Sequence, residues 1–201
     1  MSAPRSRREQ YSDATRAAIL DAATHRFATN GFAATGLEDI AADINATRGA
    51  VYHHFASKKA LFEAVLTEQE IAAITRTRTA HQSAPGPWQG ALAALEAFLD
   101  QCVDPVYSRI VWLEGPIALG WAAWQEAEQK YALAHIGDIL GELVAEGLLD
   151  PIPLETATQI TFTVLGTAGL ALAQAPPDEQ PRLRAEYADV IARMIGGLRS
   201  T

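Results

Sequence analysis

The chain has 201 residues, of which 49% are hydrophobic and 20% are charged, the usual balance of a folded protein with one large or two small domains. Its one cysteine, Cys102, excludes an internal disulfide, and residues 1–10 are too polar for a signal peptide. The net charge of −8 is unevenly placed: residues 1–60 carry +2 and the other 141 residues carry −10, so only the first part favours contact with phosphates.

Residues 1–12 read as a flexible basic segment, and a first helix is predicted from residue 13 to residue 30. Apolar side chains recur along one face of this helix with α-helical spacing, at Leu20, Ala23 and Phe27. The helix should end at Asn30-Gly31, because these residue types adopt the left-handed conformation that stops helices.

A second and a third short helix follow, joined by a tight turn. The second should begin with a capping box, in which Thr35 and Glu38 each bind a free backbone amide. Asn45 suits a left-handed turn, and Thr47 is a strong N-cap for the third helix. This arrangement predicts a helix-turn-helix DNA-binding domain over residues 13–57.

The third predicted helix carries the side chains that a recognition helix needs. Val51 and Phe55 point inward at i and i+4, which turns Arg48 towards solvent. An arginine can bind guanine through two hydrogen bonds, and Gly49 permits close approach of the DNA. The candidate DNA contacts in this helix and its cap are Thr47, Arg48, Gly49, Tyr52, His53 and His54.

Two nearby features have alternative interpretations. Lys58 follows the N-cap Ser57 at the start of a helix, where a bound phosphate would offset the unfavourable helix dipole. The alternative is that Lys58 and Lys59 form a solvated pair. His53 and His54 could suggest metal ligands, but adjacent helical side chains point about 100° apart and partners at ligand spacing are missing. We therefore expect a phosphate contact at Lys58 and no metal site.

A fourth helix, residues 58–80, should connect this domain to the rest of the chain. Residues 81–87 hold two prolines and a glycine and read as a linker. The apolar stretch 160–173 has 14 residues and looks too short to cross a bilayer. Beyond the linker, residues 88–201 show only helical periodicity, with helices predicted at residues 88–103, 106–113, 120–146, 154–173 and 181–198. The predicted fold class is therefore all-α.

Aromatic side chains concentrate in the middle of this second domain. An apolar cavity with a few polar groups is the usual form of a small-molecule site. The residues predicted to line such a cavity are Phe98, Tyr107, Trp112, Trp121, Trp124, Tyr131, His135 and Phe162. The alternative is an ordinary hydrophobic core. Glu114 is compatible either with burial or with a solvated helix end.

The last two predicted helices carry more apolar surface than one helix pair can bury. Residues 161–173 are apolar on more than one side and need cover on more than one side. We therefore expect a homodimer, with an interface that includes Thr161, Leu165, Gly169, Leu172, Tyr187, Ile191, Met194 and Leu198. The alternative is a purely intramolecular core.

Residues 16–66 resemble the DNA-binding domain of the TetR family of bacterial transcriptional regulators. The matching features are Asn30-Gly31-Phe32, Ile40-Ala41 and the block Thr47-Arg48-Gly49-x-Val51-Tyr52-His53-His54-Phe55-x-Ser57-Lys58. The resemblance implies that Thr35 also faces DNA, that the last two helices pair with a second subunit as a four-helix bundle, and that a larger helical domain, residues 88–201, encloses a ligand pocket. Asn45 departs from the family, which usually has glycine there.

The sequence thus predicts a bacterial, cytoplasmic transcriptional regulator that is not an enzyme and needs no cofactor. We expect a homodimeric repressor that binds a palindromic operator in double-stranded DNA and is released by a small apolar or amphipathic effector. One alternative is a DNA-binding regulator without an effector. Another is a helical enzyme acting on a small ligand, which the lack of a nucleophile elbow, phosphate loop or metal-ligand cluster in the sequence disfavours.

Overall fold

The computed structural model describes residues 7–199, and their regular structure is helical apart from one isolated antiparallel bridge between Leu149 and Arg199. The all-α prediction is confirmed. The elements in chain order are α1 (Arg7–Ala34), α2 (Leu37–Asp43), α3 (Arg48–His54), α4 (Lys58–Ser83), α5 (Pro87–Cys102), α6 (Pro105–Tyr107), the π-helix η1 (Ser108–Glu114), α7 (Gly115–Leu119), α8 (Trp121–Ala145), α9 (Leu154–Gln174) and α10 (Gln180–Gly196).

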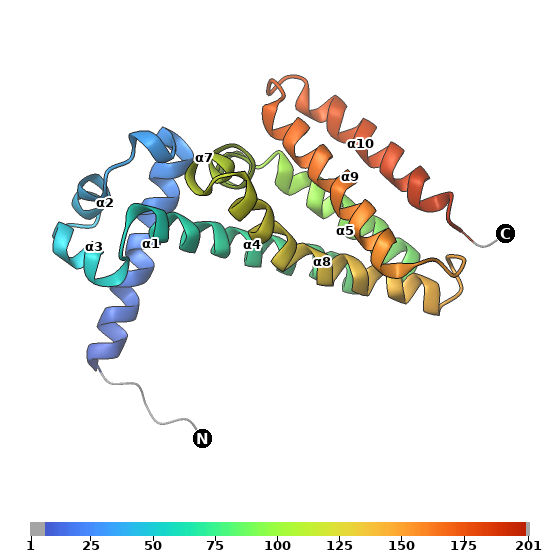
Figure 1. The fold of residues 1–201 in the computed structure, drawn as a ribbon, viewed down its shortest axis with the longest axis horizontal. Coiled ribbons are helices and arrows are strands. Elements are labelled where there is room, and N and C mark those ends of the chain that lie inside the picture. The colour runs from blue at the N-terminus through green and yellow to red at the C-terminus, as the bar shows by residue number, and fades with distance from the viewer. Residues whose placement is uncertain (1–6, 200–201) are drawn as a thin grey trace.

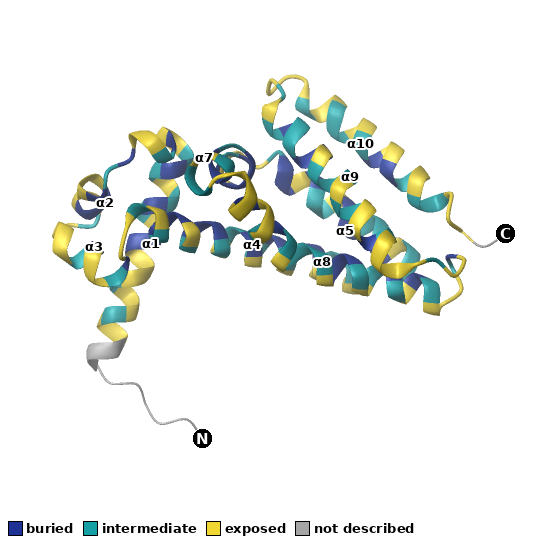
Figure 2. Ribbon diagram, viewed as in Figure 1, coloured by how far each residue is buried: buried dark blue, intermediate teal, exposed yellow. Residues whose placement is uncertain are grey.

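Helix α4 joins the two parts of the molecule. In Figure 1, α1, α2 and α3 lie at one end of α4, and α5, α8, α9 and α10 gather around its other half. We call these parts the DNA-binding half and the regulatory half. Figure 2 shows buried residues where the helices face one another and exposed residues along the outer sides of α2, α3 and α10.

The first helix begins earlier than predicted and is interrupted where its end was predicted. It begins at Arg7, so residues 7–12 are helical, and the part of the predicted flexible segment before residue 7 lies outside the described residues. Arginine, glutamate and glutamine favour helices, which accounts for the early start. The predicted stop at Asn30-Gly31 is confirmed, because Gly31 has a φ of 80° and a ψ of 167° that interrupt the helix, and a further short helical piece follows to Ala34.

The DNA-binding half has a tightly packed aromatic core. The ring centroids of Phe27 and Phe62 are 5.1 Å apart, and Phe32 packs edge-on against Phe62 at 5.4 Å. Phe27 and Phe62 have no exposed surface, so α1 and α4 are held together by rings without access to water. This core continues along α4 into the regulatory half, where it includes Leu99 and Leu172.

The connections in the regulatory half are shorter than predicted. Helix α4 runs on to Ser83 and α5 begins at Pro87, so most of the predicted linker 81–87 is helical. The predicted helix 106–113 is a chain of three short pieces, α6, η1 and α7. A proline at the first position of α5 removes an amide that would lack a partner there in any case, which explains why the linker can be so brief.

Helix α9 has 21 residues, with a mean hydropathy of 1.2 over its most apolar 18-residue window. The whole helix is longer than the 14-residue stretch on which the expectation rested, and by length and composition alone it could cross a membrane. Core helices of packed proteins meet the same two criteria, and α9 lies against α5, α8 and η1. The flanking residues 154–159, which are more polar, extended the helix beyond the 14 residues counted in the sequence.

Candidate DNA interface and effector cavity

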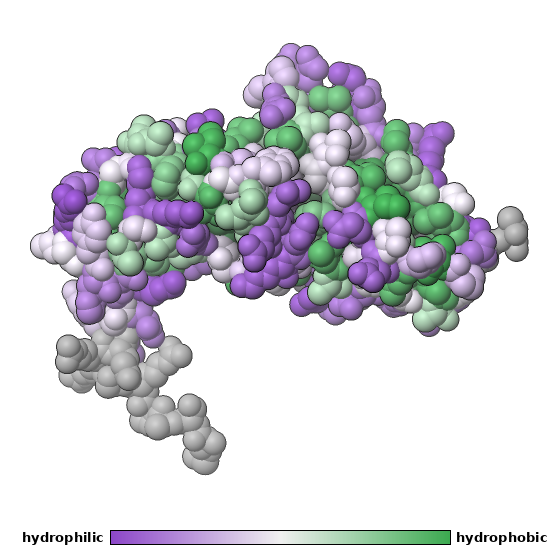
Figure 3. Space-filling model, in the orientation of Figure 1, coloured by the Kyte–Doolittle hydropathy of each residue, from purple (hydrophilic) through white to green (hydrophobic). Residues whose placement is uncertain are grey.

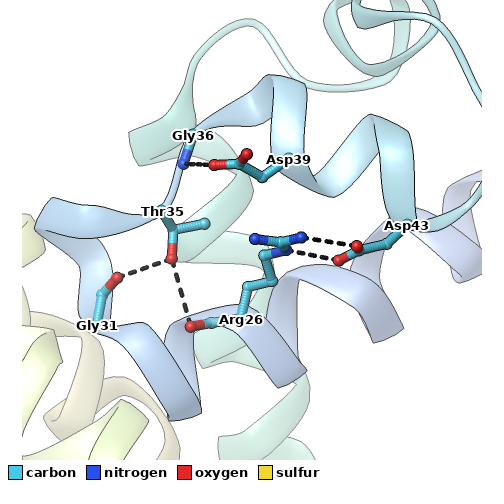
Figure 4. A network of polar contacts seen from close by, with 6 residues as sticks. All are labelled: Arg26, Gly31, Thr35, Gly36, Asp39 and Asp43. Atoms are coloured by element: carbon cyan, nitrogen blue, oxygen red, sulfur yellow. Dashed lines mark hydrogen bonds and ion pairs between the residues drawn. The ribbon is translucent and has the colours of Figure 1, made fainter.

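Helix α2 is fixed on α1 by polar contacts, shown in Figure 4. The Arg26 guanidinium donates two hydrogen bonds to the Asp43 carboxylate, at 2.6 and 2.7 Å, and lowers the pKa of that carboxyl group. The Gly36 amide donates to Asp39 Oδ2 at 3.1 Å. Gly36 is thus the N-cap residue of α2, and the predicted capping box of Thr35 and Glu38 was wrong by one residue.

Helix α3 is held in place by a capped turn and two apolar side chains. Asn45 has a φ of 54°, which confirms the left-handed turn, and the Thr47 hydroxyl accepts a hydrogen bond from the Ala50 amide at 3.2 Å. Val51 and Phe55 are buried against the core. These contacts leave the opposite face of α3 free, as a recognition helix requires.

The free face of α3 presents a cation joined to an aromatic ring. Arg48 donates to the Tyr52 hydroxyl at 3.2 Å, and its guanidinium carbon lies 5.2 Å from the centre of the Tyr52 ring. Arg48 also forms an exposed ion pair with Glu38 of α2, at 2.5 Å. Both partners raise the pKa of Arg48, Tyr52 most. His53 is exposed beside them, and its ring lies 5.4 Å from that of His54.

Two predicted DNA contacts are placed differently from their prediction. Thr35 is only 1% exposed, and its hydroxyl donates to the Gly31 carbonyl at 2.8 Å. The Lys58 ammonium donates to the carbonyls of Phe32, Ala33 and Thr35, at 2.8, 3.3 and 3.0 Å. Lys58 therefore neutralises the negative end of α1 instead of standing free for a phosphate. The neighbouring Lys59 is exposed.

The regulatory half encloses a cavity of about 300 Å³ between α4, α5, η1, α8 and α9. Seven of the eight predicted residues line it: Phe98, Tyr107, Trp112, Trp121, Trp124, His135 and Phe162. The eighth, Tyr131, does not, because its hydroxyl points to Thr67, 3.4 Å away. The exposed lining residues Trp121, Gln125, Thr163 and Thr167 place the opening between α8 and α9.

Two buried acids in this cavity were missed. Glu70 of α4 is 3% exposed and Glu128 of α8 is 5% exposed, and the Tyr107 hydroxyl donates to Glu70 at 3.2 Å. Burial raises the pKa of Glu70 to about 7; it also raises the pKa of Glu128, and the charge of Glu70 adds to that effect. The sequence held a signal for one of them, since Glu70 interrupts the apolar face that runs through Leu66 and Ala73.

A third buried acid connects the halves. Glu114, at the end of η1, accepts a hydrogen bond from the Phe32 amide at 2.8 Å and pairs with Arg109 at 2.8 Å. It sits where a side chain on Gly31 would be, because a Cβ there would lie 2.8 Å from Glu114 Oε1. The same π-helix carries Trp112 into the cavity wall. One short element thus touches both the cavity and the bend of α1.

Part of the predicted dimer interface lies inside the protomer instead. Gly169, Leu172 and Ile191 are buried, and a Cβ on Gly169 would meet the Trp112 ring at 2.3 Å. Thr161 and Leu165 line the cavity, and Tyr187 is half-buried. The large apolar residues left exposed are Leu154 and Ile160 on α9, Val190 and Met194 on α10, and Leu198 just after α10, so two of the five were predicted.

A capped helix-turn-helix with an exposed arginine, joined to a helical domain with an internal cavity, defines a helix-turn-helix transcriptional regulator. The family model for bacterial regulatory proteins of the tetR family matches residues 19–65. The model for the tetracyclin repressor-like C-terminal domain matches residues 88–198, more than half of the chain. The protein belongs to the TetR family of transcriptional regulators.

Individual relatives agree with this assignment. The chain is 25% identical over 131 residues to the transposon Tn10 TetC protein of Escherichia coli, covering 65% of this chain and 66% of TetC. It is 45% identical over 69 residues to the HTH-type transcriptional repressor Rv3405c of Mycobacterium tuberculosis, about a third of each protein. A TetR-family regulator from Pectobacterium atrosepticum shares the fold, with a TM-score of 0.85, 24% identity and coverage of 98% and 99% of the two chains.

Proposed function

We propose that this regulator is a homodimeric repressor that binds a palindromic operator and is released when a small effector enters the cavity. The observation that carries the proposal is the exposed face of α3, on which Arg48 and Tyr52 lie opposite a buried, well-anchored face. Such a helix presents its N-terminal residues to base edges in the major groove. A repressor among the relatives is consistent with this role.

The proposed DNA contacts are the residues that α3 leaves accessible: Thr47, Arg48, Gly49, Tyr52, His53 and His54. A side chain on Gly49 would meet only its neighbour Thr47, so this part of the helix surface is open to DNA. In the free protein Arg48 is paired with Glu38. Because that pair is exposed and weak, guanine and phosphate can replace the carboxylate at little cost.

The proposed dimer uses the outer faces of α9 and α10. Val190 and Met194 are one helical turn apart on α10 and are about half exposed, and Ile160 is exposed on α9. Figure 3 shows hydrophobic residues on the surface of the half that contains these helices. A second copy would cover these residues and fix the distance between the two recognition helices. That distance must match the spacing of the two half-sites in a palindromic operator.

The proposed signal runs from the cavity through η1 to α1. An effector that contacts Trp112 would shift η1. Because Glu114 of η1 accepts a hydrogen bond from the Phe32 amide, a shift of η1 would also move the end of α1. The change in recognition-helix spacing is a population shift between two states. We expect Glu114→Gln to raise the effector concentration needed for half-release, while the affinity for effector changes less.

A cytoplasmic location follows from this role, since the operator is there. The runner-up, a regulator without effector, is disfavoured by the cavity's buried polar atoms without partners, Gln101 Oε1 and Glu128 Oε1 among them. Buried polar groups without partners cost free energy, and a bound ligand offsets that cost.

The test is selection of bound fragments from random DNA, followed by binding assays on the selected sequence. We expect an inverted repeat bound by a dimer in light scattering. Arg48→Ala should lose about 1–3 kcal/mol and relax base preference at one position of each half-site. The matched control is Arg76→Ala, which removes an exposed arginine of α4 that lies outside α3 and outside the proposed dimer faces. No enrichment, or a monomer with and without DNA, contradicts the proposal.

A further inference from the structure

We infer that the cavity binds an organic cation, an amine or quaternary ammonium carried on an apolar ring or chain, with Glu70 and Glu128 as its counter-charges. The inference rests on the proposed function, because it names the chemical class of the effector that would fill the same cavity. The polar residues that carry it lie on α4, α5, α6 and α8 and line a mainly apolar space.

The cavity wall contains two acids and one histidine, His135, and burial lowers the pKa of His135, which disfavours its positively charged form. Glu70 and Glu128 line the cavity, and neither lysine nor arginine does so among the described residues. Both acids are more than nine-tenths buried, and each lies close enough to the other to disfavour ionisation of the pair. An anionic ligand would add a further negative charge here. A cation would supply the positive charge that two buried carboxylates lack.

The hydrogen-bonding groups beside the two acids leave acceptors unused. The Tyr107 hydroxyl donates its one hydrogen bond to Glu70, and Gln101 donates to the carbonyls of Ala97 and Ala73, at 3.0 and 3.4 Å. Gln101 Oε1 and Glu128 Oε1 are buried without a donor. Ammonium groups bring only donors, or for quaternary ammonium only charge, so they suit the two acceptor oxygens that lack a donor.

The rest of the wall is mainly apolar and combines aliphatic side chains with aromatic rings. Six phenylalanine, tyrosine and tryptophan rings line the cavity, and Trp112 and Trp124 pack edge to face with their centroids 5.8 Å apart. The face of an indole ring attracts a cation more strongly when water is excluded. The indole nitrogens of Trp112 and Trp124 also lack hydrogen-bond partners. The carboxylates and the ring faces together therefore favour a ligand that is an amphipathic cation.

Three probes of one shape separate charge from size: phenyltrimethylammonium, its neutral isostere tert-butylbenzene, and benzenesulfonate. Their binding to the full-length protein is measured by tryptophan fluorescence and by the shift in melting temperature. We expect the cation to bind at least ten times more tightly than the neutral probe, and benzenesulfonate not to bind. Glu128→Gln should abolish that tenfold preference while leaving the affinity for tert-butylbenzene unchanged.

The matched control is Glu126→Gln, which removes an exposed carboxylate from the same helix outside the cavity and should keep the preference. Glu70→Gln serves as the second variant if Glu128→Gln does not fold. Equal binding of the cation and the neutral probe, tighter binding of the anion, binding of none of the three, or a preference that survives both variants would overturn the inference. Operator binding by the same preparations tests the proposed function separately, because it does not depend on the probes.

Discussion

The two halves of the molecule treat buried polar groups in opposite ways. In the DNA-binding half, buried or half-buried polar groups such as Thr35 and Lys58 are paired within the chain. All the buried side-chain nitrogen and oxygen atoms without a hydrogen-bond partner, among the described residues, lie beyond residue 80: His81, Gln101, Arg109, Trp112, Trp124, Glu128 and His135. Five of these seven residues line the cavity, namely Gln101, Trp112, Trp124, Glu128 and His135, so a bound ligand can supply hydrogen-bond partners that the regulatory half lacks.

The largest expected loss of stability comes from a substitution in the packed core of the DNA-binding half. Phe62→Ala removes a fully buried ring that packs against Phe27 and Phe32, so the protein should lose about 3–5 kcal/mol of unfolding free energy. Urea unfolding followed by circular dichroism measures this. Phe162→Ala, which removes a half-buried ring from the cavity wall, should cost clearly less, and an equal loss would show that the cavity is packed like a core.

The next effect concerns pH and the regulatory half. Burial raises the pKa of Glu70 to about 7 in the folded chain, from 4.5 when exposed. The folded state therefore binds the Glu70 proton more tightly than the unfolded state does. The resulting stabilisation, on the order of 3 kcal/mol of unfolding free energy, is complete below pH 4.5 and is lost as the pH rises through 7. Glu70→Gln should flatten the decline in unfolding free energy between pH 5 and pH 8.

The charge of His135 acts in the other direction. Burial lowers the pKa of His135, and the charges of Arg78 and His81 add to the effect. The stabilisation of the folded state by neutral His135 is therefore lost as the pH falls below 6.5. Comparing wild type with Glu70→Gln at each pH cancels this second effect. Identical pH profiles for the two proteins would mean that Glu70 is ionised without penalty, and the deficit assigned to the cavity would be smaller than described.

A smaller loss of stability is expected at one of two adjacent lysines, Lys58 and Lys59, and not at the other. Lys58→Ala should cost about 1.5–3 kcal/mol of unfolding free energy, because the carbonyls at the end of α1 lose a charged donor. Lys59→Ala, at an exposed site, should cost almost nothing. If Lys58→Ala keeps full stability and instead reduces the salt dependence of operator binding, then Lys58 binds phosphate as the sequence first suggested.

What could be predicted from the sequence was local. Asn45, Thr47 and Ser57 were assigned to a turn and two caps, and all three behave so, because each interaction is closed within three residues. The helix order beyond residue 88 also followed from periodicity and breakers. Helix ends moved by a few residues where polar segments with good helix propensity extended them, as at Arg7.

What could not be predicted depends on contacts between distant segments. The Lys58 ammonium reaches carbonyls 23 to 26 residues earlier, and no pattern within one helix indicates that. Glu70 and Glu128 lie on different helices, so their proximity appears only when α4 and α8 pack. The outer face of α9 was misassigned because this helix is apolar around much of its circumference, and periodicity does not say which side the protomer itself covers.

The most direct test of the account uses the position of the four tryptophans, all of which lie beyond residue 87. Anisotropy of the labelled operator and tryptophan emission are read in the same samples as effectors are added. A compound that releases the operator should change the emission strongly, because Trp112, Trp121 and Trp124 line the cavity, whereas operator alone should change it little. Release of the operator with unchanged emission would contradict the account, since the effector would then bind outside the regulatory cavity.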